Sequence, residues 1–417
     1  MIIQGIVPGR AEPLTIVIEG GRFLRIEYDQ RGFPVDPFDG AKPRLSRRGL
    51  KAPLRVNPEQ APAFMRGNRR VDFGGPELFV FSGFFDPQVN GFAGVDFNDW
   101  NLNPERFQTA VRSLASFGVT RFFPTLITAS HERILHQLKL ITQTLESDPL
   151  SNQMCPGIHL EGPYLNPEEG PRGAHPREFI RKPQWDEILK LQEVCRGRIR
   201  LITLAPETEG AIPFIEKAVS EGTVIGIGHT NASEEILEDA VRAGARLSTH
   251  LGNGAQAILP RHRNPIQKQL SLDELMASII PDGVHLPDYV VKNFVRTKGV
   301  DRMLLTTDAM AGAGAPPGRY TLGDLEVDVG SDQVARLRDT PYLAGSTLTM
   351  EKAVENVMRF SKVDLPTALR MASQNGNQIF PECRGEIEVG QSADLVLFEF
   401  KDRLIVKSAW VHGEKIY

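Results

Sequence analysis

Short apolar runs alternate with amphipathic stretches through the middle of this chain. In the stretch 234–241 the apolar side chains recur at helical spacing, and Ser233 is placed to cap its first turn. Such alternation predicts parallel strands joined by right-handed crossovers, with the helices outside. The apolar runs number about eight, as a closed (β/α)8 barrel needs. They lie at 78–85, 119–123, 157–159, 199–204, 224–228, 246–250, 278–280 and 303–307.

Both ends of the chain have the character of β structure. The runs 15–19 and 23–27 flank Gly20 and Gly21, which is a hairpin signal. Chain ends often lie close together, so we expect one small domain built from both. The fold class predicted is α/β, a (β/α)8 TIM-like barrel with a small β-sandwich domain formed by both chain ends. Its later β-like segments are 385–390, 393–398 and 404–411.

The predicted division of the chain has three parts. Residues 1–75 hold the first part of the small β domain, residues 76–380 the barrel, and residues 381–417 the rest of the β domain. Within the first part, residues 29–70 are rich in Pro, Arg, Gly and Asn and have little periodicity. This composition indicates an irregular insertion.

Polar and ionisable side chains follow the predicted barrel strands directly. The active site of such a barrel lies at the carboxyl ends of its strands, so these residues are candidates for its chemistry. Their concentration is unusual for a chain that has only nine histidines. In chain order they are Asp86, Gln88, Asn90, Glu161, His229, His250, Asp282, His285 and Asp308.

One carboxylate and two imidazoles in this set match a catalytic metal site. Glu161, His229 and His250 follow the third, fifth and sixth strands, and three such ligands leave a fourth position for water. Alone, each has a plainer interpretation, as a hydrogen-bonded structural histidine or a solvated loop carboxylate. Asp308, after the eighth strand, is placed to take a proton from that water and pass it to a leaving amine. Its alternative role is to cap the next helix or bind a turn amide.

Composition narrows the classes of function. The net charge is -4 and there is no long basic run, which gives no support for nucleic-acid or membrane-surface binding. No apolar window reaches the length of a membrane span, and the first residues lack the features of a signal peptide. The cysteines Cys155, Cys195 and Cys383 form no C-x-x-C pair, so we expect a reducing, cytoplasmic location. Phosphate-loop and serine-hydrolase motifs are lacking.

Several short motifs occur in a fixed order along the chain. They include His159-Leu160-Glu161-Gly162-Pro163, followed by Gly173-Ala174-His175-Pro176, and then the segments 228–232, 249–253, 282–285, 307–310 and 343–346. As an ordered set they resemble the N-acetylglucosamine-6-phosphate deacetylases of the amidohydrolase superfamily. The resemblance extends from about residue 78 to the end of the chain.

The resemblance implies roles for the matching positions. One divalent metal ion, zinc or alternatively iron, manganese or cobalt, would be held by Glu161, His229 and His250, with Asp308 as general base and acid. The small-molecule partner would be an amino sugar, and the protein would be a homodimer whose phosphate site borrows a basic residue across the interface. The implied substrate contacts are Ala174, His175, Asn253, Gly254, Arg263, His285, Leu343, Ala344 and Gly345.

Two departures from the family pattern affect these expectations. Gln88-Val89-Asn90 stands where many amidohydrolases have His-x-His. Because amides are poor zinc ligands, Gln88 and Asn90 would be vestiges of a second metal site. The phosphate region reads Arg261-His262-Arg263-Asn264, so Arg261 is an alternative to Arg263 and the need for a 6-phosphate is open.

The function expected from the resemblance is metal-dependent hydrolysis of an N-acetyl group. N-acetylglucosamine 6-phosphate would give glucosamine 6-phosphate and acetate. A galactosamine or unphosphorylated sugar remains open as the substrate. The rival interpretations are another amidohydrolase, such as a cyclic amidase or deaminase, and a non-catalytic sugar-phosphate sensor.

Overall fold

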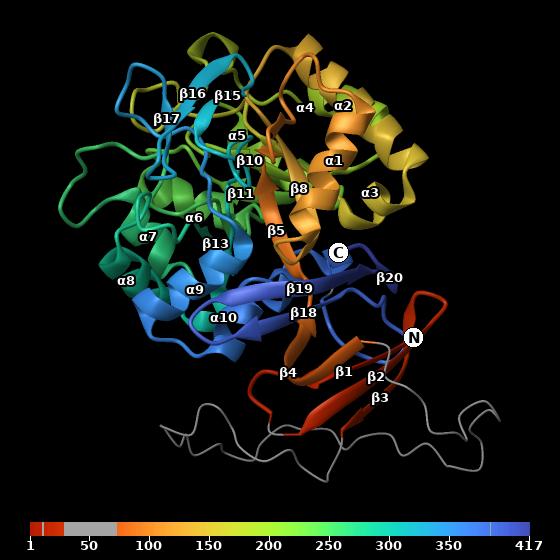
Figure 1. The fold of residues 1–417 in the computed structure, drawn as a ribbon. Coiled ribbons are helices and arrows are strands. Elements are labelled where there is room, and N and C mark those ends of the chain that lie inside the picture. The colour runs from red at the N-terminus through yellow and green to blue at the C-terminus, as the bar shows by residue number, and fades with distance from the viewer. Residues whose placement is uncertain (11, 29–72, 384) are drawn as a thin grey trace.

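The computed structural model describes residues 1–10, 12–28, 73–383 and 385–417. Its barrel stands above a separate, mostly antiparallel sheet that contains both chain ends (Figure 1). The insertion predicted at 29–70 lies outside the described residues. None of the described helices combines the length and the apolar sequence that crossing a bilayer requires.

Eight parallel strands form the barrel, as the sequence predicts. Each pairs with its neighbour in parallel register, in the order of the chain. This order carries every carboxyl end to one rim, which is where the polar residues were expected to meet. The strands are β5 (Phe84–Val89), β8 (Val119–Ile127), β9 (Ile158–Glu161), β10 (Ile199–Leu204), β11 (Val224–Ile227), β12 (Leu247–Ser248), β13 (Met276–Ile279) and β14 (Met303–Leu305).

A buried carboxylate helps to close the barrel between its last and first strands. Asp86 on β5 accepts a hydrogen bond from Thr306 Oγ1 at 2.8 Å and another from the Thr307 backbone at 3.3 Å, just after β14. The Asn90 backbone also donates to Ala309 O at 2.7 Å. Burial raises the pKa of Asp86 to about 6. This strand-end residue therefore joins two strands rather than lining the cavity.

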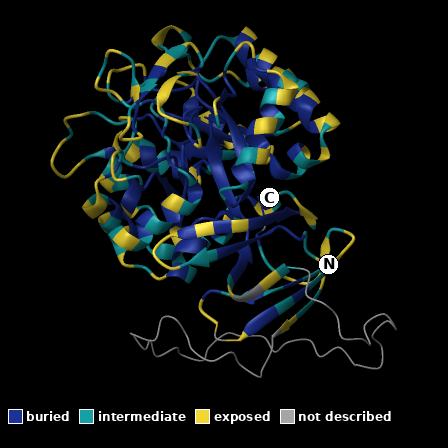
Figure 2. Ribbon diagram, viewed as in Figure 1, coloured by how far each residue is buried: buried dark blue, intermediate teal, exposed yellow. Residues whose placement is uncertain are grey.

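The helices cover the outside of the barrel and turn their apolar faces inward. Figure 2 shows buried strands at the centre and exposed positions on the outer faces of the helices. In α6 the buried side chains are Leu237, Ala240 and Val241, and Ser233 caps the helix by accepting from the Ile236 backbone, as predicted. The helices are α1 (Pro104–Ala115), α2 (His131–Ser147), α3 (Pro149–Met154), α4 (Trp185–Val194), α5 (Ala211–Ser220), α6 (Glu234–Arg242), α7 (Pro265–Ser271), α8 (Asp288–Lys298), α9 (Met350–Ser361) and α10 (Leu365–Met371).

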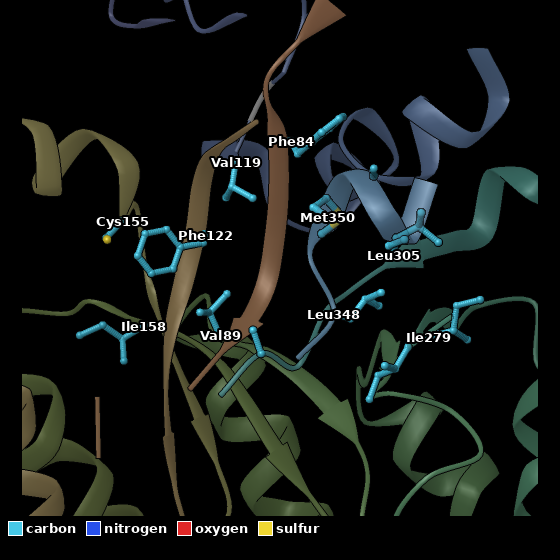
Figure 3. Packing of buried hydrophobic residues seen from close by; sticks show 14 of the residues in the cluster. Phe84, Val89, Val119, Phe122, Cys155, Ile158, Ile279, Leu305, Leu348 and Met350 are labelled. Atoms are coloured by element: carbon cyan, nitrogen blue, oxygen red, sulfur yellow. The ribbon is translucent and has the colours of Figure 1, made fainter. Parts of the chain in front are cut away.

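Two groups of apolar side chains pack the barrel. The large group lies between strands and helices, where Phe84, Val119 and Phe122 of β5 and β8 belong to the same cluster as Met350 of α9 (Figure 3). A second group fills the barrel itself. In it Phe85, Phe123 and Phe380 meet edge to face, with ring centroids 5.1–5.6 Å apart.

The two chain ends share a seven-stranded sheet, ordered β20-β19-β18-β4-β1-β2-β3. Strand β4 connects them, because it pairs in parallel with β1 and antiparallel with β18. The predicted hairpin around Gly20 and Gly21 is confirmed. The domain boundaries at 75 and 380 stay a prediction. The strands are β1 (Ile2–Ile6), β2 (Pro13–Glu19), β3 (Arg22–Tyr28), β4 (Phe73–Ser82), β18 (Leu395–Phe400), β19 (Leu404–Val411) and β20 (Glu414–Lys415).

Two predicted segments were wrong. The apolar run 78–85 is two strands in different sheets, β4 and β5, separated at Gly83. A Cβ at that glycine would lie 2.0 Å from Thr120 Oγ1, so only glycine fits this crossing. The segment 385–390 forms no strand; it runs as a turn beside β3, where the Gly390 backbone donates to Phe23 O.

A small sheet after β14 was not expected from the sequence. It consists of β15 (Gly318–Leu322), β16 (Leu325–Val329) and β17 (Ala335–Leu337), joined as antiparallel neighbours. Figure 1 shows it at the end of the barrel opposite the seven-stranded sheet. A two-stranded ribbon, β6 (Gly91–Phe92) and β7 (Val95–Asp96), follows β5.

Candidate metal centre and active site

A cavity of about 310 Å³ opens where the barrel strands end. It collects residues that are distant in sequence, because each follows a different parallel strand. Most of the residues expected at the site line it. They are Asn90, Glu161, Ala174, His175, His229, His250, Asn253, Gly254, His285, Asp308, Leu343, Ala344 and Gly345.

Glu161, His229 and His250 converge at the bottom of this cavity. Glu161 is the last residue of β9, and the two histidines lie two residues beyond the ends of β11 and β12. Glu161 Oε1 is 3.1 Å from His229 Nε2 and 2.8 Å from His250 Nε2. The two Nε2 atoms are 3.2 Å apart. Ligand atoms about 2.1 Å from a tetrahedral ion would be roughly 3.4 Å from each other, which is close to this spacing.

The hydrogen bonding of His229 shows that a cation suits this cluster. Its Nδ1 donates to Pro171 O at 2.8 Å, so in the neutral ring Nε2 carries a lone pair. That lone pair is directed at Glu161 Oε1, which is itself an acceptor. Two acceptors so close together need a positive charge between them, and the donor set is one that a divalent metal ion prefers.

A third histidine approaches the same point. His175 Nε2 lies 3.3 Å from His229 Nε2, and Glu161, His175 and His229 form a set of ligand atoms all within 4.8 Å of one another. His250, which contacts Glu161 directly, is the alternative to His175 as the third ligand of this set. Burial, with the neighbouring His229, lowers the pKa of His175 to about 3, so this ring is neutral.

Burial and charge act against each other at the cluster. Burial alone would raise the pKa of Glu161, but the imidazoles of His229 and His250 beside it hold that pKa well below its usual range. Burial likewise opposes the charged form of His250, yet its bond to Glu161 raises the pKa of that ring. The carboxylate is therefore ionised, as a metal ligand must be.

Asp308 faces the cluster from the loop that follows β14. It is buried, three residues beyond β14, and burial together with the charge of Glu161 raises its pKa. Gln88 Nε2 and Asn90 Nδ2 both donate to its Oδ1, at 2.9 and 2.7 Å. The two amides thus hold Asp308 in place, and they leave Oδ2 free to exchange a proton.

The backbone around these residues is unusual. His229, His250 and Asp308 all have positive φ, at 52°, 31° and 50°. For residues with a Cβ this region is sparsely populated and costs on the order of 1–3 kcal/mol each. Such strain clusters at functional sites, and here it turns three side chains toward one cavity.

Other expected contacts surround the cluster. His285 Nδ1 pairs with Asp282 Oδ2 at 2.7 Å, and Asn253 Nδ2 donates to His250 O. Gly254 has a φ of 56°, and a Cβ there would lie 2.7 Å from His229 Nδ1. Gly254 is therefore required for the loop to approach the imidazole so closely.

The structure does not bring the expected phosphate contacts to the cavity. Arg261 and Arg263 are exposed on the loop between β12 and α7 and are not among the lining residues. The lining given by the described residues of one chain contains neither lysine nor arginine.

Sequence reasoning did not assign six of the lining residues to the site, which are Ile127, Gly173, Leu322, Leu325, Pro341 and Tyr342. Leu322 and Leu325 flank the Gly323-Asp324 turn of the β15–β16 hairpin. Such a turn between alternating strands is a recognisable hairpin signal. No sequence signal shows that this hairpin lies beside the cavity.

This chain resembles one group of known enzymes in both sequence and structure. Residues 79–416 match the model of the amidohydrolase family. The N-acetylglucosamine-6-phosphate deacetylase of Caenorhabditis elegans is 31% identical over 82% of this chain and 83% of that protein. The one from Danio rerio is 32% identical over 87% and 90%. A Mycobacterium smegmatis N-acetyl-D-glucosamine-6-phosphate deacetylase mutant, solved in complex with N-acetyl-D-glucosamine-6-phosphate, has 27% identity and a TM-score of 0.82, covering 100% of this chain and 99% of its own.

Proposed function

Since this chain belongs to the N-acetylglucosamine-6-phosphate deacetylases of the amidohydrolase family, we propose that it hydrolyses N-acetylglucosamine 6-phosphate to glucosamine 6-phosphate and acetate. One observation supports this most strongly. Glu161, His229, His250 and Asp308, from four strands, meet in one cavity with the acceptor atoms of a metal site and a carboxyl group beside it.

We assign one divalent metal ion, zinc, to Glu161, His229 and His250. His250 is preferred to His175 because its Nε2 lies 2.8 Å from Glu161 and it is fixed at a strand end. His175 belongs to the long loop after β9. A bound zinc ion polarises an amide carbonyl and lowers the pKa of water toward about 7. Gln88 and Asn90 serve Asp308 and not a second metal.

The residues around the cluster supply the proton transfers. Asp308 Oδ2 takes the proton of the attacking water, because Oδ1 is already occupied by the two amides. His175 is neutral, and its Nε2 lies 3.3 Å from His229 Nε2, beside the proposed metal position, so a proton on this nitrogen is placed to be donated to the oxyanion of the tetrahedral intermediate. Asp308 then returns the proton to the departing amine.

The phosphate group needs a cationic partner, and the described residues that line one chain's cavity include neither lysine nor arginine. We assign that role to a second copy, in a homodimer where Arg263, or alternatively Arg261, extends from its exposed loop to the neighbouring cavity. We place the protein in the cytoplasm, a location that its three free, buried cysteines suit.

Product analysis tests the proposed function directly. The purified metal-loaded protein is incubated with N-acetylglucosamine 6-phosphate, N-acetylglucosamine and N-acetylgalactosamine 6-phosphate, and acetate and ammonia are measured separately. Acetate release fastest from the first sugar is the expected result. Ammonia without acetate would assign a deaminase, and neither product from any of the sugars would contradict hydrolysis altogether.

A further inference from the structure

One aromatic side chain stands at the mouth of the catalytic cavity. Among the described residues, Tyr342 is the only Phe, Tyr or Trp in the lining, and 55% of it is exposed. Its backbone is fixed, because Tyr342 O accepts from the Leu337 backbone at the end of β17. It directly precedes Leu343, Ala344 and Gly345, which also line the cavity.

The phenol of Tyr342 is held from across the mouth. It donates to Glu169 Oε1 at 2.9 Å, and Glu169 belongs to the loop between β9 and α4 that also carries His175. The adjacent Glu168 accepts from Gln256 Nε2 at 2.9 Å, on the loop after β12. Three rim segments are therefore tied together by two side-chain hydrogen bonds, and the Tyr342 ring is held at one of them.

The depth of the site indicates what this ring would meet. A scissile amide must reach Asp308, which is only 8% exposed, so the acyl group lies deepest. The sugar ring attached to that amide then lies farther out, at the level of the rim. The C–H faces of a pyranose are apolar, and an aromatic ring is a suitable surface for them.

We propose that Tyr342 is a substrate-contact residue whose ring packs on a face of the amino-sugar ring, and that Glu169 is a positioning residue that holds this ring over the cavity. The proposal deepens the proposed function and rests on it, since an N-acylated amino sugar is taken as the occupant. Neither residue belongs to the metal cluster, so both act on binding and not on the proton transfers.

Steady-state kinetics of Tyr342→Ala test the contact. Loss of the ring raises KM about three- to tenfold, the size of an aromatic packing contribution, while kcat stays within twofold. Tyr289→Ala is the matched control, because Tyr289 is 64% exposed and lies outside the lining. It leaves both constants unchanged. An unchanged KM in Tyr342→Ala, or a fall in kcat alone, would overturn the contact.

A second set of variants tests the role of Glu169. Tyr342→Phe and Glu169→Ala each remove the hydrogen bond and raise KM by less than Tyr342→Ala does. The double variant raises it no further, because both changes remove the same interaction. Glu169→Gln keeps an acceptor oxygen and retains a KM near that of the wild type. Additive increases of KM in the double variant, or a raised KM in Glu169→Gln, would contradict the positioning role of Glu169.

Binding without turnover separates this inference from the proposed function. Calorimetry measures the Kd of N-acetylglucosamine 6-phosphate in Asp308→Asn and in Asp308→Asn with Tyr342→Ala, and the second value is expected to be three- to tenfold higher. Acetate release by the wild type with equal Kd values would overturn the inference alone. No acetate release and no binding in either variant would overturn both proposals.

Discussion

At the scale of single residues, hydrogen bonds leave the key side chains of the site only one atom each for its chemistry. His229 can offer only Nε2 to the cluster, because Nδ1 is engaged by Pro171 O. Asp308 can exchange a proton only through Oδ2, because Gln88 and Asn90 occupy Oδ1. Each restriction comes from a hydrogen bond outside the reacting atoms, which is how supporting residues tune a metal site.

Asp308→Asn tests the assignment of the proton carrier. An amide cannot take a proton from water at neutral pH, so kcat falls by about 10²–10⁴-fold. The metal content stays near that of the wild type, because Asp308 is not among the proposed ligands. Acetate release and elemental analysis measure the two effects. Asp402→Asn, at an exposed position, is the control. Full activity in Asp308→Asn would remove Asp308 from the mechanism.

At the scale of elements, the β15–β16 hairpin depends on one buried carboxylate. Asp96 Oδ2 accepts from the Gly323 backbone at 2.8 Å and from Thr321 Oγ1 at 3.0 Å, and Oδ1 accepts from the Asn98 backbone. The turn held in this way lies between Leu322 and Leu325, two residues of the cavity wall. Burial raises the pKa of Asp96 to about 7.

This shift predicts how stability depends on pH. The folded protein binds the Asp96 proton more tightly than the unfolded chain, so the stabilising contribution is complete below pH 3.8 and is lost as the pH rises through about 7. The free energy of unfolding measured with urea is therefore lower at pH 8 than at pH 5, by on the order of a few kcal/mol. In Asp96→Asn, whose amide cannot ionise, the free energy of unfolding depends less steeply on pH. An equally steep pH dependence in the variant and the wild type would contradict the raised pKa of Asp96.

A second prediction at this scale concerns the interior of the barrel. Phe123 is fully buried on β8 and contacts the rings of Phe85 and Phe380. Phe123→Ala leaves a cavity and lowers the free energy of unfolding by about 3–5 kcal/mol. Leu189→Ala, at a position that is 50% exposed, is the control and costs less than about 1 kcal/mol. Urea denaturation compares them, and similar losses for both would contradict the packing described.

At the scale of the whole molecule, the barrel could be predicted because its signal is repeated. Helical patterns separate most of the apolar runs, and parallel strands bring their carboxyl ends together whatever the sequence separation. Glu161 and His250 are 89 positions apart, yet they are in contact. The strand-end rule therefore located the candidate site without any knowledge of the loops.

The features that could not be predicted depend on tertiary contacts. The run 78–85 is buried on both sides of Gly83, so its pattern does not show that the chain passes from one sheet to another. Tyr342, Leu322 and Leu325 line the cavity because the segment after β14 folds back over the barrel. Local periodicity carries no information about that direction. Local periodicity likewise does not show that the loop with Arg263 runs away from the cavity.

Glu161, His229 and His250 are proposed to hold one catalytic metal ion, and anomalous X-ray scattering from crystals tests this assignment most directly. Data are collected from crystals of the zinc-loaded protein above and below the zinc absorption edge. The expected result is a single peak within about 2.0–2.2 Å of Glu161 Oε1 and of Nε2 in both histidines. A peak that excludes His250, or no peak in crystals of fully active protein, would contradict it.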